Sequence, residues 1–499
     1  MEECQLSNKK EYPVFKNVKD VQKYMETKVG SGVSYDVDHR DIYILKTEVQ
    51  LYYLNGMVDD AIVTQVLREL VEINDYETNQ KKVGAIVENR LINQSLDIAV
   101  KMDEAVDQLL SGLIVIFVDG VKKAFILDVR QYPGRQPEEP DTERVVRGAR
   151  DGYTENVVFN TALTRMRIRD ERLRNEMVKV GVRSKTDVCI SYLQDVADDE
   201  LVELTKNKLK EIDIDGIPMA DKTVEEFIVE NKWNPYPVVR YTERPDVAAK
   251  HILEGHVVVT VDNTPSVVIL PTTFFDSLEH AEEFRQAPAV GTFMRWVRLI
   301  AVLASLYLLP LWLLFVMDPS LLPEKLSFIG PNEEGNIPIY VQILFGIIGV
   351  EFLRLAAVHT PTPLATSMGL IAAVLIGEIA IDVGMLSPEV ILYVSVSTIG
   401  NYVTPSYELS VANKLVTTIL IILTALFKAE GFVIGFLIHI LYLVGLKAFK
   451  TPYLWPFIPF DPVAMLRFLL RIPVPYVNTR PSIIHPKDTY SQPLPKKEK

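Results

Sequence analysis

The chain changes character near residue 290. Before it, short apolar stretches alternate with charged ones, and after it long apolar runs dominate. Four of these runs have about 20 residues, which is enough to cross the hydrocarbon core of a bilayer as a helix. They are residues 296–317, 338–358, 364–386 and 431–449. Two shorter runs, 388–403 and 415–427, could be tilted, re-entrant or paired. The pattern predicts an all-α polytopic membrane domain over residues 291–450, with four to six membrane segments.

Charges beside the apolar runs predict how this domain is oriented, because cytoplasmic flanks are rich in lysine and arginine. Arg285 and Arg295 precede the first run and Arg298 lies at its start, the loop after it is acidic, and basic residues return after the last run. Both ends of the domain are therefore expected in the cytoplasm, which requires an even number of crossings. Residues 451–499 are predicted to form an interfacial segment and a basic tail, with Tyr453 and Trp455 at headgroup depth.

The region before residue 290 contains one pattern twice. The segment YLNGMVDD at residues 53–60 is echoed by YLQDVADD at residues 192–199, and residues 109–120 are echoed by residues 252–263. Each copy reads as a strand, a helix, a further helix and a β-hairpin. The pattern predicts an α/β soluble half made of two similar tandem modules, residues 1–135 and 186–290. Within them, segments 41–130 and 186–271 should superpose.

An arginine-rich connector, residues 136–185, joins the two predicted modules. Its residues 154–181 are expected to form one amphipathic helix that ends at a glycine. A charged cluster lies at its start and could be a salt-bridge network that orders the connector or a site for an anionic ligand. The members of this cluster are Arg144, Arg147, Arg150, Asp151 and Glu155.

Overall charge and motif content exclude several classes of protein. The net charge of −13 and the acidic soluble half argue against a nucleic-acid-binding protein. The two cysteines, Cys4 and Cys189, suit a reducing compartment, and the first residues do not read as a secretory signal. Phosphate-binding loops, zinc-binding spacings and nucleophile elbows are absent from the sequence. We expect no enzymatic activity, no cofactor and no metal site.

Ionisable residues inside the apolar runs are the remaining chemistry, because such residues are costly in a bilayer and must face protein or water. Glu351 and Arg354 are spaced to pair on one helix face. Glu378 and Asp382 lie on one face of a predicted helix without a basic residue in that run, opposite a stripe of small residues. They are candidates to line a water-filled path, and the alternative is internal packing near a membrane surface.

Polar residues in the next two segments have similar alternatives. Thr398 and Asn401 share about one face of residues 388–403, where they could line the same path or bond to neighbouring helices. His439, in the last run, is expected to make a polar helix contact rather than to bind a metal.

Four long segments, in fixed order, resemble a known family. Residues 138–174, 242–275, 377–390 and 399–410 are similar to the motifs of the A-type subunits of bacterial spore germinant receptors, the GerA family. The likeness covers nearly all of residues 41–475. Ala149, Glu378 and Asp382 stand where the receptor subunits usually carry proline, glutamine and glutamate, which favours a paralogue of the receptor subunit.

The resemblance implies an inner spore membrane protein that acts in germination. It also implies a ring-shaped homo-oligomer, plausibly a pentamer, that conducts ions, with other germination membrane proteins as possible partners. On this basis we expect a subunit of an ion channel, with the soluble modules as a cytoplasmic collar. Two rival hypotheses are a membrane scaffold that does not conduct and a component that transports a small anion such as dipicolinate.

Overall fold

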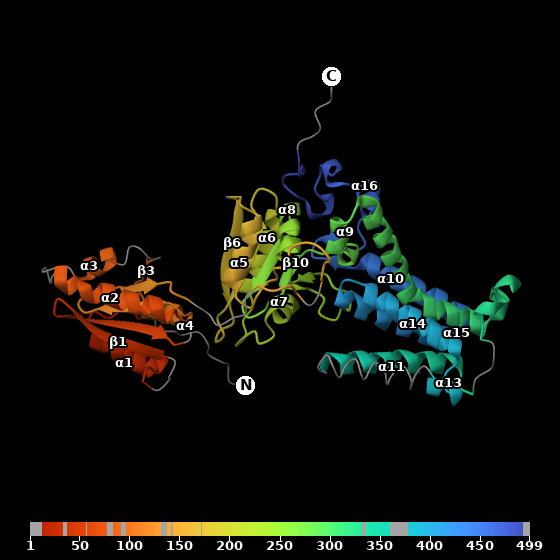
Figure 1. Cartoon of the computed structure of the whole chain (residues 1–499), viewed down its shortest axis with the longest axis horizontal. Helices are drawn as coiled ribbons and strands as arrows, with labels where there is room; N and C mark the ends of the chain where they lie inside the picture. Colours follow the sequence, from red (N-terminus) through yellow and green to blue (C-terminus); the bar gives the residue numbers. More distant parts are fainter. Residues whose placement is uncertain are drawn as a thin grey trace, which may run out of the picture. The chain divides into compact units, whose positions relative to one another are not determined.

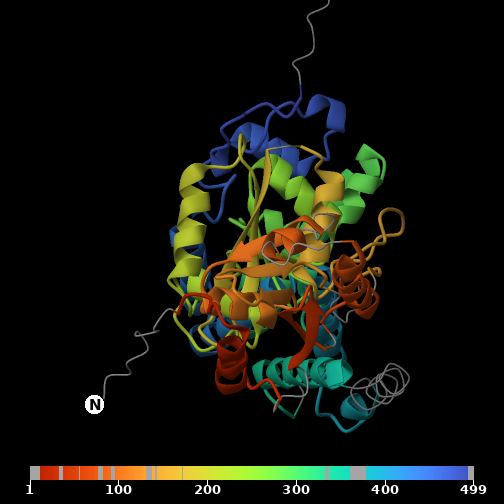
Figure 2. The ribbon, with the colours of Figure 1, turned by 90° about the vertical axis from the view of Figure 1, so that its left-hand side faces the viewer.

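The computed structural model describes residues 12–32, 37–55, 57–76, 83–90, 96–130, 137–140, 143–170, 172–331, 336–359 and 378–492. The chain divides into two compact units, Met1–Gly134 and Arg135–Lys499. The first is an α/β module, and the second joins another α/β module to the helices of the apolar half (Figures 1 and 2).

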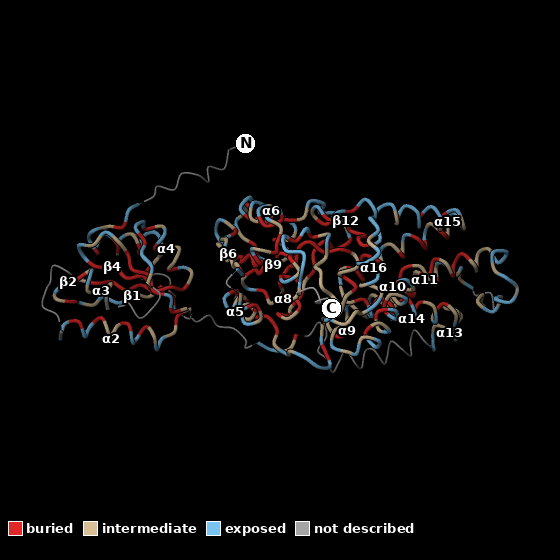
Figure 3. Tube along the Cα trace, turned by 90° about the horizontal axis from the view of Figure 1, so that it is seen from above, coloured by how far each residue is buried: buried red, intermediate tan, exposed pale blue. Residues whose placement is uncertain are grey.

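The first unit is built around a five-stranded antiparallel sheet with the order β1-β2-β4-β5-β3. Helices α2 and α3 pack on one face of this sheet, and α1 and α4 pack on the other. All five residues of β4 are buried, as expected for a central strand that is covered on both faces (Figure 3). The strands are β1 (Val37–Ile44), β2 (Thr47–Leu54), β3 (Leu96–Ala99), β4 (Ile114–Val118) and β5 (Ala124–Leu127). The helices are α1 (Val18–Tyr24), α2 (Asp60–Tyr76), α3 (Val83–Arg90) and α4 (Met102–Leu110).

The second module has a five-stranded antiparallel sheet with the order β6-β7-β9-β10-β8. Numbered from its own first strand, this is the same order as in the first unit. Helices α6 and α7 cover one face, and α5 and α8 cover the other. The strands are β6 (Leu173–Val180), β7 (Thr186–Leu193), β8 (Arg240–Thr242), β9 (Val257–Val261) and β10 (Val267–Leu270). The helices are α5 (Val157–Arg167), α6 (Asp199–Lys210), α7 (Ala220–Ile228) and α8 (Pro245–Glu254).

The predicted connector helix over residues 154–181 is wrong in its second half. Helix α5 ends at Arg167, and residues 173–180 form the edge strand β6, which pairs with all eight residues of β7. Tertiary contacts decide this structure: Leu173 and Val180, at the two ends of the strand, are buried on the sheet, while the residues between them are more exposed. The second module therefore includes part of the predicted connector.

Three helices in the described part of the apolar half are long and apolar enough to cross a membrane. They are α10 (Pro288–Met317), α11 (Ile339–His359) and α15 (Tyr407–Gly445). The first two confirm the predicted runs 296–317 and 338–358 as long apolar helices. The shorter helix α14 (Pro388–Val403) packs against α10 and α11. Most of the predicted run 364–386 lies outside the described residues, which resume at Glu378 and include the short helix α13 (Ala380–Asp382).

Helix α15 is a hairpin of two helical legs, residues 407–427 and 429–445. Lys428 breaks the helix, with φ 49° and ψ −129°. A Cβ built on Gly435 would lie 2.7 Å from Leu420 and 2.9 Å from Leu423, so the second leg runs back along the first. The legs are about 31 Å and about 26 Å long at 1.5 Å per residue. The predicted runs 415–427 and 431–449 are thus parts of paired legs.

The C-terminal segment packs on the second module. Tyr453 is fully buried there, and its ring contacts those of Tyr236 and Phe274. Trp455 is also buried, at 9% exposure. After the short helix α16 (Pro462–Leu469), Lys487 contacts Asp199 of α6 at 2.5 Å. The segment and the module therefore lie on the same side of any membrane that the helices cross.

Candidate functional site

A buried ion network joins the connector to the second module. The carboxylate of Glu143 accepts hydrogen bonds from Arg240 at 2.9 Å and from Thr242 at 2.5 Å. Arg244 is fully buried, donates to the backbone oxygens of Glu143 and Ala149, and pairs with Asp246 at 2.9 Å. Because buried charges need partners, these contacts fix the connector against the strand β8 and the start of α8.

The same network holds the first apolar helix. Arg295, two turns into α10, lies 3.4 Å from Glu279 and contacts Glu283, which Arg298 also contacts. Lys250 of α8 bonds to Glu279 at 2.9 Å. Burial alone would raise the pKa of Glu279, but the charges of Lys250 and Arg295 lower it to about 2. Movements of the second module are thereby coupled to α10.

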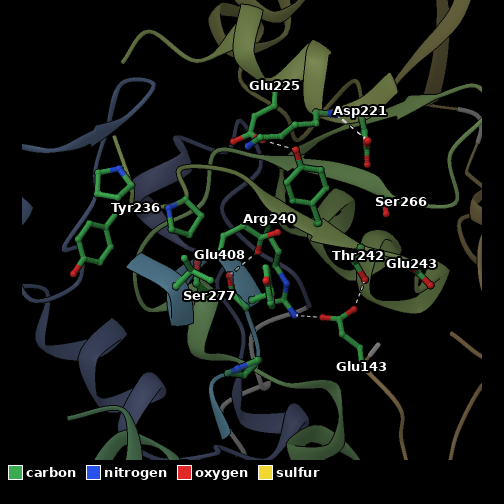
Figure 4. A pocket seen from close by; sticks show the side chains of 18 of the residues that line it. Glu143, Asp221, Glu225, Tyr236, Arg240, Thr242, Glu243, Ser266, Ser277 and Glu408 are labelled. Atoms are coloured by element: carbon green, nitrogen blue, oxygen red, sulfur yellow. Dashed lines mark hydrogen bonds and ion pairs between the residues drawn. The ribbon is translucent and has the colours of Figure 1, made fainter. Parts of the chain in front are cut away.

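An open cavity of about 680 Å³ lies between the second module and the ends of the apolar helices (Figure 4). Tyr236 and Tyr241 line it from the module, and Tyr407 and Val411 line it from α15. Burial raises the pKa of Asp221. The carboxylates that line the cavity outnumber its cationic side chains by five to three, which favours the entry of cations over anions. The acids are Glu143, Asp221, Glu225, Glu243 and Glu408, and the bases are Lys222, Arg240 and Arg354.

Inside the helices, the carboxylate of Glu351 is held between two cations. Arg354, one turn along α11, contacts it, as the sequence predicts, and Lys414 of α15 contacts it from the other side. Arg354 also lies over the ring of Tyr407, 5.1 Å from its centroid, and lines the large cavity. This group of three charged side chains therefore adjoins the cavity, and the contact of Glu351 with Lys414 links α11 to α15.

A second, much smaller cavity adjoins this ion group. Asn401 and Thr398 of α14 line it together with Lys414 and Thr417 of α15. The Oδ1 atom of Asn401 is buried and has no hydrogen-bond partner among the described residues. The neighbouring Ser397 is buried too, and donates to the backbone oxygen of Ser305 in α10 at 3.1 Å. The predicted lining residues of α14 thus face the interior of this chain's own helix bundle.

The other predicted lining residues lie elsewhere. Glu378 and Asp382 are exposed, and they lie in the helical residues 378–382 that are followed by a turn at Gly384 with φ +70°. Ala373 and Gly377, which belong to the predicted small-residue stripe, lie outside the described residues. The structure does not bring Glu378 or Asp382 to the cavity that Thr398 and Asn401 line.

His439 makes the expected polar contact. Its Nε2 atom lies 2.8 Å from the hydroxyl of Tyr236, and its Nδ1 atom lies 2.8 Å from the hydroxyl of Tyr307 in α10. The Tyr236 hydroxyl also reaches Asn413 at 3.3 Å. One side chain of the second module is therefore bonded to both legs of the α15 hairpin. Within the described residues, no group of three or more His, Cys, Asp or Glu side chains could hold a metal ion.

The chain is similar over nearly its whole length to proteins of one known family. Residues 23–483 match the family model described as Bacillus/Clostridium GerA spore germination protein. The chain belongs to the GerA family. It is 56% identical to stage V sporulation protein AF of Bacillus subtilis, over 96% of this chain and 97% of that protein. It is 27% identical to spore germination protein KA of the same organism, over 97% and 90%.

A solved structure also aligns with the chain. It is the N-terminal domain of the A subunit of the Bacillus megaterium spore germinant receptor GerK3, with 24% identity, 53% of this chain and 99% of that chain covered. Its TM-score of 0.23 is too low for a comparison of architecture.

The buried network of this GerA-family chain uses arginines outside the predicted connector cluster. Arg144, Arg147 and Arg150 are all exposed, and Arg150 lies 3.9 Å from Glu139. Asp151 pairs with Arg167 of α5 at 2.6 Å, and the backbone oxygen of Glu155 accepts from Asn263. The buried network instead uses Arg240 and Arg244, which flank the short strand β8. The sequence offered a sign of their role, because arginines beside a strand that must be buried require charged or hydrogen-bonding partners.

Lys414 was missed for a different reason. It directly precedes the apolar run 415–427, where a lysine is typical of the flank of a membrane segment. Helix α15 begins at Tyr407, two turns earlier, which carries Lys414 into the bundle. The polar residues Ser410 and Asn413, buried in the same stretch, were the available sign that the helix starts before the apolar run.

Proposed function

We propose that the chain is a subunit of an oligomeric ion channel in the inner spore membrane that acts in germination. One observation carries the proposal: ionisable side chains of the apolar helices, Glu351, Arg354 and Lys414, adjoin an acid-lined cavity. Charged groups at such a depth are costly and usually mark an ion path or a relay. Family membership and the names of the relatives support the role in sporulation and germination.

The proposed assembly is a ring of identical subunits, plausibly five, with the α/β modules in the cytoplasm. Six crossings would result if α10, α11, residues 364–386, α14 and the two legs of α15 each cross once. Three features support this count: the hairpin at Lys428, the basic flanks, and the C-terminal segment that folds back on the second module. The third membrane segment, with Glu378 and Asp382, would face the shared path. Thr398 and Asn401 would serve a polar seam inside each subunit.

The two modules are further proposed to derive from one duplicated unit, with residues 41–130 corresponding to residues 186–271. Their identical strand orders support this origin, as does the matching placement of helices on both faces of each sheet.

The proposal is tested by reconstituting the purified full chain in liposomes and following potassium flux with a potential-sensitive dye. Flux above that of protein-free liposomes, abolished by heat-denaturing the protein before reconstitution, is expected. If well-assembled protein carries no flux in the presence or absence of its germination partners, the chain is a scaffold instead. Flux of dipicolinate in preference to potassium would favour the transport of small anions.

A further inference from the structure

Trp233 of the second module is almost fully exposed. Its exposed fraction, 96%, is the largest among the exposed large apolar side chains of the described residues. It lies in a turn between helix α7 and strand β8, next to the exposed Lys232. A tryptophan ring joins a large apolar surface to a polar N–H group, so it suits surroundings that are apolar on one side and wet on the other. The position of this turn relative to the apolar helices therefore decides what the ring can contact.

The turn that carries Trp233 is held in one conformation by two asparagines. The backbone N–H of Asn234 donates to the backbone oxygen of Asn231 at 3.3 Å, which closes a four-residue turn. The side-chain oxygen of Asn231 accepts from the N–H of Trp233 at 3.3 Å, and the side-chain amide of Asn234 donates to the backbone oxygen of Tyr236 at 2.6 Å. Trp233 is therefore presented by a built turn.

The same turn is attached to the second leg of α15. The hydroxyl of Tyr442 donates to the side-chain oxygen of Asn234 at 2.7 Å, about one turn before the leg ends at Gly445. The hydrocarbon core of a bilayer is about 30 Å thick, and the whole leg is about 26 Å long. A leg of this length crosses the core only if its last turn lies at the boundary between lipid and water. Asn234 and the turn then lie at that boundary too.

The second leg presents an apolar face that leads to the turn. Four side chains with helical spacing are 52–69% exposed, namely Ile434, Leu437, Ile438 and Leu441. In a helix that crosses a membrane, a face of this kind contacts acyl chains. The residue after Leu441 is Tyr442, which bonds to the turn. The lipid-facing surface of the leg therefore ends beside Trp233.

We propose that the turn at Lys232 and Trp233 is a membrane-contact site of the second module. The Trp233 ring inserts at the boundary between phospholipid headgroups and acyl chains, where tryptophan is enriched in membrane proteins. The ammonium group of Lys232 meets the lipid phosphates from the exposed side of the turn. The contact rests on the crossing of the second α15 leg, which is part of the proposed function. It adds a direct hold of the soluble module on the bilayer, close to the Tyr236 side chain that bonds to the hairpin.

The depth of Trp233 can be measured by fluorescence quenching in the full chain. The protein is reconstituted in liposomes of phosphatidylcholine and phosphatidylglycerol that carry a nitroxide quencher either near the headgroup or near the end of an acyl chain. The chain has four tryptophans, so the emission of Trp233 is obtained by subtracting the emission of Trp233→Phe from that of the wild type. The shallow quencher should reduce this difference about two-fold more than the deep one, because an interfacial tryptophan lies at headgroup depth.

Met177→Trp combined with Trp233→Phe is the matched control. Met177 is also exposed, at 47%, but it lies on β6, the edge strand on the side of the sheet away from the apolar helices (Figure 1). At the usual spacing of strands, β6 is about 19 Å from β8, the opposite edge of the same sheet. A tryptophan at residue 177 should therefore be quenched by acrylamide in the water and by neither lipid quencher.

Two results would overturn the membrane contact. Emission of Trp233 that acrylamide quenches as strongly as that of the control would mean a turn in water. Emission that neither acrylamide nor the lipid quenchers reduce would mean that a second copy of the chain or another protein covers the ring. Trp233→Tyr gives the same subtraction where phenylalanine prevents insertion. Lipid quenching without potassium flux would reject the channel and leave the contact standing, whereas flux without lipid quenching would do the reverse.

Discussion

The hydroxyl of Tyr236 lies 2.8 Å from Nε2 of His439, so a side chain of the second module is bonded inside the α15 hairpin. The other ring nitrogen of His439 meets Tyr307 of α10, and the same Tyr236 hydroxyl reaches Asn413. A single phenol therefore connects the soluble module to both hairpin legs, and through His439 to the first apolar helix. The second module and the hairpin should respond together when either is disturbed.

Removing this hydroxyl tests that link. Tyr236→Phe leaves buried polar groups on His439 and Asn413 without their partner, which costs about 1–3 kcal/mol. We expect a lower melting temperature of the purified chain and faster proteolysis of the hairpin. Tyr43→Phe, at an exposed position of the first unit, is the matched control and should have no effect. An unchanged melting temperature in Tyr236→Phe would mean that apolar packing alone holds the module on the hairpin.

Gly148 offers a test of the ion network. It has φ +143°, and a Cβ at this position would collide with the guanidinium of Arg285, which pairs with Asp246 at 2.6 Å. Gly148→Ala should therefore destabilise the chain by about 1–3 kcal/mol, through backbone strain and a displaced ion pair. Adding Arg285→Ala should recover part of the loss by removing the collision. Gly445→Ala is the control, because a Cβ there meets nothing within 4 Å. Equal stabilities of the two alanine variants would contradict the close approach.

The pKa of Glu279 predicts how stability depends on pH. It is lowered from 4.5 to about 2 in the folded chain, so the unfolded chain binds the proton more readily. The resulting stabilisation, about 3 kcal/mol, is fully present above pH 4.5 and is lost as the pH falls towards 2. Melting temperatures measured from pH 6 to pH 3 should therefore fall less steeply for Glu279→Gln, although that variant is less stable throughout. An exposed control, Glu203→Gln, should keep the wild-type slope.

Sequence reasoning succeeded where the hydrophobic pattern is long and local. The uninterrupted runs that became α10 and α11 leave no alternative to apolar helices. The predicted order of strands and helices in the two modules rests on turn residues and capping acids close to each element. The helix predicted over residues 173–180 was wrong, because these residues form a strand only through their pairing with β7. A local pattern of mixed polar and apolar residues cannot reveal such a partner.

The site was less predictable because its contacts join distant parts of the chain. Glu143 and Arg240 are 97 positions apart, and Lys414 and Glu351 are 63 positions apart. The pair Glu351 and Arg354 was found because it lies within one helical turn. The prediction for Tyr453 rested on residue type alone, which could not reveal that its ring packs against Tyr236 and Phe274 of the second module. Aromatic residues near a membrane segment suit either place.

The last prediction concerns the conduction path. Glu378 and Asp382 are exposed in the single chain, as residues that face a path shared by several subunits would be. Rings of carboxylates concentrate cations and exclude anions, and each subunit would contribute both residues. Glu378→Gln with Asp382→Asn should therefore lower potassium flux in liposomes several-fold while insertion and assembly are kept. Lysine at either position should reduce flux further, since it places a ring of positive charge in the path. Glu430→Gln, at the exposed turn of the α15 hairpin, controls for the loss of a charge outside the path. Unchanged flux in a well-assembled double variant would move the path to the face of α14 that carries Thr398 and Asn401, and loss of assembly would make the carboxylates structural.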